Sequence, residues 1–144
     1  MKEEEKLKLK IGLIGEENCG KTCFVKKLVH NAFDQDKIST IGVSIAIQEL
    51  EELTIKFYDF SGDEKYNYFV TSLFTLLDAI IFIYDTTKEF PKNYFLEKIK
   101  NIEEKIQQKE DEKHIIYFMV GTKNAIKKER KVSFDEVNKF FQRK

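Results

Sequence analysis

The chain has 144 residues, a length that favours a single domain spanning residues 1–144 with a sizeable buried core. Its 25 basic and 25 acidic residues balance, so no net charge attracts nucleic acid or an acidic membrane, and a partner must be recognised locally. Two cysteines are too few for a disulfide scaffold and fit a reducing compartment. The sequence has no signal-peptide core, no apolar run near the ~20 residues of a membrane span, and no terminal glycine or cysteine placed for a lipid anchor. We therefore expect a cytoplasmic protein without a transmembrane segment, a lipid anchor or a nucleic-acid partner.

The first predicted strand, Leu9–Ile14, leads into the sequence G-x-x-x-x-G-K-T, in which two glycines allow a tight loop whose N–H groups point at phosphate oxygens. Lys21 can reach the terminal phosphates, and the Thr22 hydroxyl can bind Mg²⁺. Apolar residues at helical spacing then predict a helix from Lys21 to His30. Strand, loop and helix follow in the order that a phosphate-binding loop requires. The predicted phosphate-binding residues are Gly15, Glu17, Asn18, Cys19, Gly20, Lys21, Thr22 and Cys23.

The next elements are two short strands, predicted at Ile41–Leu50 and Leu53–Tyr58, with a polar loop before them. Because they are separated by a tight connection, we expect them to pair in antiparallel orientation. Residues 59–63 break the alternating pattern. Apolar residues recurring from Tyr66 to Leu77 then predict a second helix.

Two continuous apolar runs, Ala79–Tyr84 and Ile115–Val120, are typical of parallel strands that are covered on both faces. Between them a long helix is predicted by one apolar stripe, with lysine and glutamate on its outer side; the stripe comprises Phe95, Ile99, Ile102 and Ile106. Ser133 and Glu136 have capping-box spacing and predict a last helix from about Phe134 to Phe141. Its inward residues are predicted to be Phe134, Val137, Phe140 and Phe141.

The alternation of strands and helices, with a phosphate loop after the first strand, predicts an α/β fold of the P-loop NTPase type. We expect a doubly wound sheet of about five strands, mostly parallel with one antiparallel strand. A bound nucleotide then lies at the carboxyl ends of the strands.

A magnesium ion in such a site needs oxygen ligands beyond the loop hydroxyl of Thr22. Thr40 lies at the end of the polar loop, and Asp59 ends a strand expected beside the first one. Either residue alone is also compatible with a bland role, Asp59 as a helix or turn cap and Thr40 as the start of a strand. Together with the phosphate loop they predict a Mg²⁺-nucleotide site.

Three further motifs resemble those of the Ras superfamily of small GTPases, most closely the Rab branch, and the resemblance covers nearly the whole chain. They are Ser39-Thr40-Ile41-Gly42-Val43 for the first switch, Asp59-Phe60-Ser61-Gly62-Asp63-Glu64 for the second switch, and Tyr84-Asp85-Thr86-Thr87 after the fourth strand. The resemblance implies GTP or GDP bound with Mg²⁺. It also implies that Phe33 stacks on the base, that Thr40 senses the terminal phosphate through Mg²⁺, and that the Gly62 N–H contacts this phosphate. Asp59 then holds the metal through water, and Thr122 and Lys123 match the start of the base-reading [NT]-K-x-D motif.

The chain departs from the family at residues that matter for hydrolysis and base selection. Asp63 stands where the family has the glutamine that orients the attacking water, so this catalytic position is expected to be defective. Glu17 and Asn18 replace small residues of the phosphate loop, and Glu17 adds a negative charge near the phosphates. Ala125 stands where the family has the aspartate that reads guanine.

The family continues with another strand and a helix packed across the sheet, whereas this sequence stops at Lys144. We therefore expect a small-GTPase domain that is incomplete at its C-terminus, with aliphatic residues of Leu9–Ile14 and Ile80–Tyr84 facing outward. Because exposed apolar patches mark interaction sites, we expect a protein partner to cover this sheet face.

Three functions are compatible with these features. We favour a Rab-like GTP-binding protein with impaired hydrolysis that serves as a constitutive subunit of a larger assembly. The alternatives are an active Rab-type GTPase switch in vesicle trafficking and a pseudo-GTPase interaction module without nucleotide. A P-loop ATPase or kinase is a further alternative, disfavoured by the switch-like motifs and by the lack of a separate lid.

Overall fold

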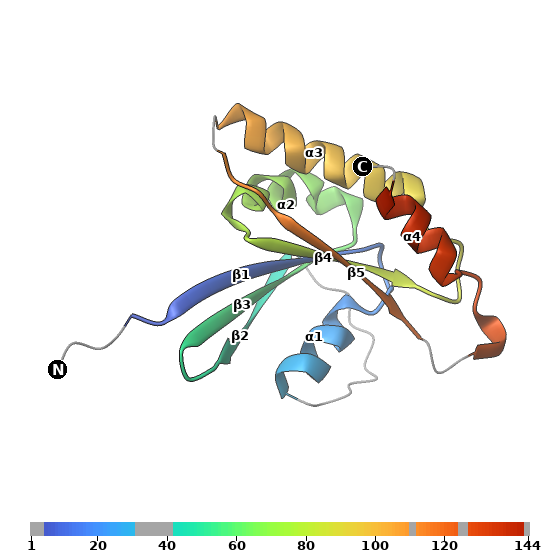
Figure 1. Cartoon of the computed structure of the whole chain (residues 1–144), viewed down its shortest axis with the longest axis horizontal. Coiled ribbons are helices and arrows are strands. Elements are labelled where there is room, and N and C mark those ends of the chain that lie inside the picture. The colour runs from blue at the N-terminus through green and yellow to red at the C-terminus, as the bar shows by residue number, and fades with distance from the viewer. Residues whose placement is uncertain (1–4, 31–41, 110–111, 124–126, 143–144) are drawn as a thin grey trace.

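A single five-stranded sheet, in the order β2-β3-β1-β4-β5, organises the residues that the computed structural model describes, namely 5–30, 42–109, 112–123 and 127–142 (Figure 1). The strands are β1 (Leu7–Ile14), β2 (Val43–Glu49), β3 (Leu53–Phe60), β4 (Ala79–Asp85) and β5 (Ile116–Thr122). β1 pairs in parallel with β3 and β4, β4 pairs in parallel with β5, and β2 pairs in antiparallel orientation with β3. The predicted fold class is therefore confirmed.

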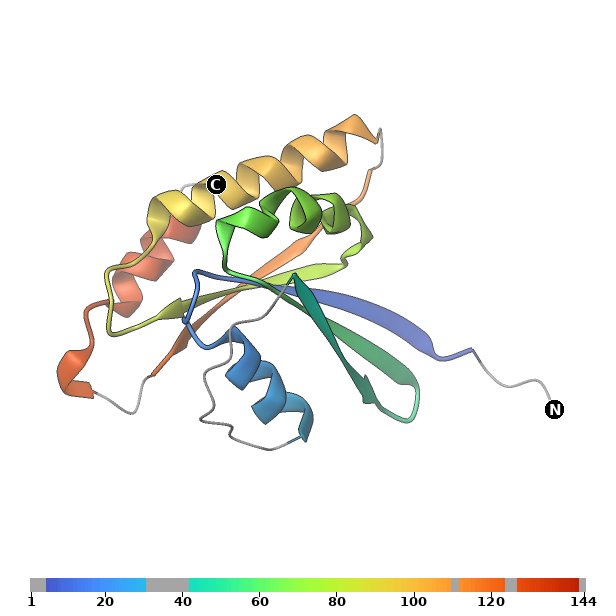
Figure 2. The ribbon, with the colours of Figure 1, turned by 180° about the vertical axis from the view of Figure 1, so that it is seen from behind.

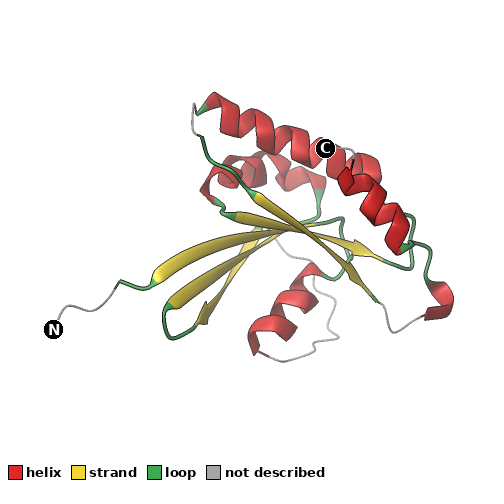
Figure 3. Ribbon diagram, viewed as in Figure 1, coloured by secondary structure: helices red, strands yellow, loops and turns green. Residues whose placement is uncertain are grey.

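Helices cover the two faces of the sheet unequally. α1 (Lys21–His30) lies on one face, and α2 (Asn67–Leu73), α3 (Lys92–Gln108) and α4 (Phe134–Gln142) lie on the other, as the views from both sides agree (Figures 1 and 2). Short 3₁₀ turns, η1 (Glu64–Tyr66), η2 (Phe74–Leu76) and η3 (Lys127–Glu129), lie in the connections. Figure 3 shows the alternation of strands and helices that the sequence predicted. No helix of the described residues is long and apolar enough to cross a membrane.

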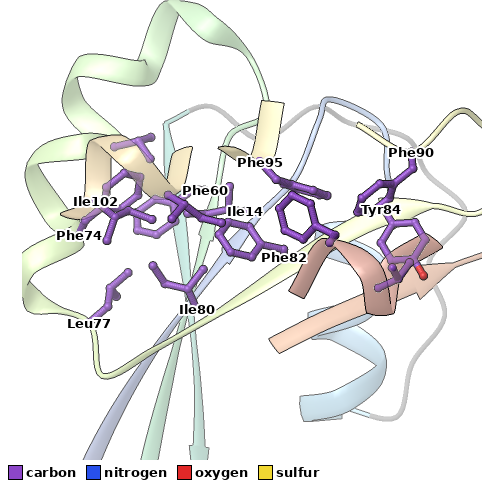
Figure 4. Packing of buried hydrophobic residues seen from close by; sticks show 14 of the residues in the cluster. Ile14, Phe60, Phe74, Leu77, Ile80, Phe82, Tyr84, Phe90, Phe95 and Ile102 are labelled. Atoms are coloured by element: carbon purple, nitrogen blue, oxygen red, sulfur yellow. The ribbon is translucent and has the colours of Figure 1, made fainter. Parts of the chain in front are cut away.

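The main core lies between the sheet and helices α2, α3 and α4 (Figure 4). Phe82 of β4 packs on Phe95 of α3, with ring centroids 5.1 Å apart, and Phe90 packs on Phe140 of α4 at 5.5 Å. The predicted stripe of α3 is confirmed, since Phe95 and Ile102 are fully buried. This face is rich in aromatic rings, which bury large apolar areas and so fix the helices on the sheet.

Two predicted side-chain orientations are wrong. Phe134 was expected to face inward but is 71% exposed, because it begins α4, at the end of the helix remote from α3 (Figure 1). Val137 and Phe140, further along the same helix, are buried as predicted. The lysines of α3 were expected on its outer side, but Lys98 is only 7% exposed, because it lies one turn after Phe95, at the edge of the apolar stripe, and there meets α2.

β5 is an edge strand, and the prediction that it is covered on both faces is wrong. Ile116 is 61% exposed and Phe118 is 53% exposed, both on the face that carries α1. α1 makes its contacts mainly with β2 and β3, so it leaves the start of β1 and much of β5 uncovered. Leu7 of β1, 70% exposed, lies on the same face by strand alternation. We refer to Leu7, Ile116 and Phe118 as the open patch.

The open patch differs from the exposed residues that the sequence predicted. Leu13 of β1 and Ile80, Phe82 and Ile83 of β4 are buried rather than facing outward. Both strands lie in the middle of the sheet, where α1 covers Leu13 and Ile83 and the opposite helices cover Ile80 and Phe82. On the sheet face that carries α1, the exposed large apolar residues of the strands are therefore in the edge strand β5 and at the start of β1.

Candidate nucleotide-binding site

The predicted phosphate loop connects β1 to α1 at the carboxyl ends of the parallel strands. Gly15 lies so close to β4 that a Cβ atom there would be 2.3 Å from the Ile83 carbonyl oxygen, so a larger residue cannot fit. Asn18 has a φ of 61°, a left-handed conformation that asparagine tolerates better than most residues. The loop therefore has the tight backbone that the glycine spacing predicted.

Lys21 is buried, and its ammonium group is held by the loop itself. Its Nζ donates hydrogen bonds to the main-chain oxygens of Gly15 and Glu16, each at 2.9 Å. A phosphate oxygen is a stronger acceptor than a neutral carbonyl, so an arriving phosphate can take over this lysine. Burial raises the pKa of the neighbouring Cys19 thiol, although Lys21 opposes this effect, so the thiol stays neutral at ordinary pH.

The predicted metal ligands Thr22 and Asp59 meet although they are 37 positions apart in the sequence. The Thr22 hydroxyl donates a hydrogen bond to Asp59 Oδ2, and Asp59 is only 2% exposed. This meeting follows from the parallel pairing of β1 with β3, which brings the ends of both strands to the same edge of the sheet. One hydroxyl and one carboxylate fit Mg²⁺, which prefers oxygen ligands and keeps waters and phosphate oxygens as the others. Elsewhere, the described residues contain no cluster of three His, Cys, Asp or Glu side chains that could hold a metal ion.

The second-switch segment lies directly against the phosphate loop. A Cβ atom on Gly62 would be 2.4 Å from the Glu17 main-chain nitrogen, so the two backbones are in contact and only glycine fits. The carboxylate of Asp63, the next residue, accepts a hydrogen bond from the Lys65 N–H at 3.1 Å and pairs with Lys65 Nζ at 3.3 Å. Asp63 thus caps η1, a local role that the sequence did not predict for it.

The predicted base-side residues Thr122 and Lys123 lie at the end of β5, next to the phosphate loop. Thr122 Oγ1 donates a hydrogen bond to the main-chain oxygen of Cys19 at 2.6 Å. Lys123 Nζ pairs with Asp85 Oδ2 at 2.7 Å. Burial acts to raise the pKa of Asp85, but hydrogen bonds from Lys123 and Thr87 outweigh it, so the pKa lies below its ordinary value and the ion pair persists at neutral pH.

Tyr94 of α3 is a site residue that the sequence analysis missed. Its hydroxyl donates a hydrogen bond to the Gly15 carbonyl at 3.0 Å, across 79 positions of sequence. The available signal in the sequence was a tyrosine hydroxyl on the apolar side of a predicted helix. The local sequence did not indicate which loop this hydroxyl contacts. Phe33 and Thr40, predicted to contact the base and the metal, lie outside the described residues, as does Ala125.

The structure thus brings together Lys21, Thr22 and Asp59, a backbone loop, and the Gly62 segment around one edge of the sheet. A lysine, a hydroxyl and a carboxylate around a tight loop can hold phosphate groups and a hard cation. Thr122 and Lys123 extend the site on the side of β5.

Comparison with known proteins gives one family. A model of the Ras family matches residues 10–144. The Ras-related protein RabC of Dictyostelium discoideum is 28% identical over 139 residues, which are 92% of this chain and 68% of that protein. Human Ras-related protein Rab-30 is 29% identical over 135 residues, covering 91% and 64%, and Rab-8A of Pongo abelii is 30% identical over 128 residues, covering 86% and 59%. The matches thus span between 59% and 68% of the length of these relatives.

Proposed function

The chain belongs to the Ras family of small GTP-binding proteins, in a Rab-like form, and on this basis we propose that it binds GTP or GDP with Mg²⁺ through Gly15–Thr22. The observation that carries the proposal is the meeting of Thr22 and Asp59 beside a loop whose lysine is held by weak, replaceable acceptors. Thr40, the third predicted metal ligand, belongs to the same proposal.

The experiment that tests nucleotide binding is extraction of nucleotide from purified protein, followed by chromatography. Wild-type protein should release guanine nucleotide, and Lys21→Ala protein should release none, because the phosphates lose their principal cation. Lys27→Ala, which removes an exposed lysine from the same helix, is the matched control and should retain the nucleotide. Equal nucleotide content in wild-type and Lys21→Ala protein would refute this site, and adenine nucleotide would point to the alternative of a P-loop ATPase.

We further propose that hydrolysis is slow. Asp63 has no amide to orient the attacking water, and its carboxylate is used to cap η1 and to pair with Lys65. Glu17 lies where the Gly62 segment touches the loop, so its negative charge is near the phosphates in this proposal. Negative charge at this place opposes the charge that develops during phosphoryl transfer.

Finally, we propose that the chain is a stable subunit of an assembly, in which an amphipathic helix of a partner protein covers the open patch. Three large apolar side chains more than half exposed on one sheet face support this proposal, because a sheet face is ordinarily buried under helices. Leu7 and Ile116 begin their strands, whereas the phosphate loop lies at the opposite ends. Association through the open patch is therefore independent of whether GTP or GDP is bound.

A further inference from the structure

Helix α3 buries a lysine among its apolar residues, and the nucleotide site described above does not use it. Lys98 is 7% exposed and lies between Phe95 and Ile99 in the helix face that packs on the core. Burial lowers the pKa of Lys98, while the nearby Glu97 and Glu64 act in the opposite direction. A buried ammonium group is costly unless it is hydrogen-bonded, so its partners indicate why it is there.

The partners of Lys98 connect α3 to the start of α2. Its Nζ donates a hydrogen bond to the side-chain oxygen of Asn67 at 2.5 Å, and Asn67 is the first residue of α2. The same Nζ lies 5.1 Å from the centre of the Tyr94 ring, one helical turn earlier, at a distance typical of a cation–π contact. Lys98 therefore contacts α2 on one side and Tyr94 on the other.

Tyr94 extends this connection to the phosphate loop through its hydroxyl, which donates to the Gly15 carbonyl. Burial raises the pKa of Tyr94, so the hydroxyl keeps its proton and remains a donor. The Gly15 carbonyl also accepts from Lys21, whose three N–H donors are shared with the phosphates in the proposed nucleotide complex. The hydroxyl of Tyr94 is a donor to this carbonyl that the phosphates do not engage in that complex.

The segment from Gly62 to Asn67 is held at both ends. Gly62 packs on the backbone of Glu16 and Glu17, and five residues later Asn67 is bonded to Lys98. Two sets of contacts therefore connect the phosphate loop with the start of α2: one through Gly62, and one through Tyr94 and Lys98 of α3.

We propose that Tyr94 and Lys98 are positioning residues through which α3 couples the phosphate loop to the start of α2. In its functional form the inference rests on the proposed nucleotide binding: the coupling slows nucleotide release, because the loop cannot open without disturbing α3 and α2. The competing explanation is that both side chains only fill the core.

The first test measures how fast a fluorescent GDP analogue leaves the full chain. Tyr94→Phe keeps the ring, with its contacts to Lys98 and Phe95, and removes only the hydroxyl that reaches Gly15. One lost buried hydrogen bond corresponds to a release rate roughly fivefold faster. Tyr117→Phe is the matched control, since it removes a hydroxyl from another half-buried tyrosine on the same sheet face, packed on Phe82, and should leave the rate unchanged.

Lys98→Met keeps the aliphatic stem and removes the ammonium group, and it should also speed release. If the two residues act as one connection, the release rate of the double variant Tyr94→Phe/Lys98→Met should rise by less than the product of the two single increases. The reason is that a connection can be broken only once. Release rates of both single variants equal to that of the wild type would refute the functional form of the proposal.

The second test needs no nucleotide and so separates this inference from the proposed function. Hydrogen–deuterium exchange of the nucleotide-free chain should rise in residues 67–73 when Tyr94 is changed to Phe, and in residues 15–20 when Lys98 is changed to Met. Asn67→Asp keeps an acceptor for Lys98 and should preserve wild-type exchange in the loop, whereas Asn67→Leu should not. Exchange that rises only next to each substitution would show that the side chains merely fill the core. If the wild-type chain holds no nucleotide but the variants show the remote effects, the proposed function is overturned and the coupling is established.

Discussion

Asp63 follows Gly62, whose backbone touches that of Glu17, so two acidic residues lie close together in the chain segments at the candidate phosphate site. We expect single-turnover GTP hydrolysis no faster than on the order of 10⁻⁴ per second, the slow intrinsic range of such enzymes. Asp63→Gln should raise the rate, because the amide can orient water and the negative charge is removed. Glu17→Gly should raise it independently, by removing the second charge.

Asp63→Asn is the control that separates the loss of negative charge at position 63 from the gain of an amide that can orient water. It removes the charge but has too short a side chain to replace glutamine, so a rate between those of the wild type and Asp63→Gln is expected. A wild-type rate well above 10⁻³ per second, or no gain in any of the three variants, would contradict the proposed defect, since the intrinsic range is only ~10⁻⁴ per second.

At the scale of elements, α4 tests how strongly the last described helix is held on the core. Phe140 is buried against Phe90 and Phe95, whereas Phe134 on the same helix is exposed. Phe140→Ala should therefore lower the free energy of unfolding by about 3–5 kcal/mol, through lost burial and a cavity. Phe134→Ala should change it by only about 0.5 kcal/mol or less.

Urea unfolding followed by circular dichroism measures both values. The slope of the free energy of unfolding against urea concentration should be the same in all variants, which shows that the two-state comparison holds. Equal effects of the two substitutions would mean that α4 is not packed as the structure places it. The hydrogen bond from the Glu136 N–H to Ser133 Oγ, at 3.2 Å, already confirms one half of the predicted capping box at its start.

At the scale of the whole molecule, we propose that a partner protein covers the open patch, and crosslinking can test this. A photo-crosslinking amino acid at position 118 should attach to a helical segment of another protein, and equally with GDP and with a non-hydrolysable GTP analogue. The same group at position 134, an exposed phenylalanine on the opposite face, is the control and should not capture that segment.

The competing outcomes of this crosslinking are distinct. Attachment to a second copy of the chain, or capture that changes with the nucleotide, would overturn the proposed constitutive partner. So would a monomer in sedimentation that unfolds cooperatively and does not bind the apolar dye ANS, because its sheet face would then need no cover.

The sequence alone determined the fold class, the positions of most elements, and the placement of Lys21, Thr22 and Asp59, the predicted phosphate and metal residues, at one edge of the sheet. These predictions succeeded where the information is local: the G-x-x-x-x-G-K-T spacing of the loop, the apolar periods of α1 and α3, and the continuous apolar run of β4. The meeting of Thr22 with Asp59 also followed, because parallel strands bring their carboxyl ends to one edge.

The tertiary structure decided which apolar residues remain exposed and which polar residues become buried. β5 has the same continuous apolar pattern as β4, but its place at the sheet edge, beyond the reach of α1, leaves Ile116 and Phe118 open. Lys98 and Tyr94 belong to a helix whose periodicity was predicted correctly, yet their partners Asn67 and Gly15 lie 31 and 79 positions away. Burial and long-range hydrogen bonds depend on which elements meet in space, and a periodic pattern within one element does not contain that information.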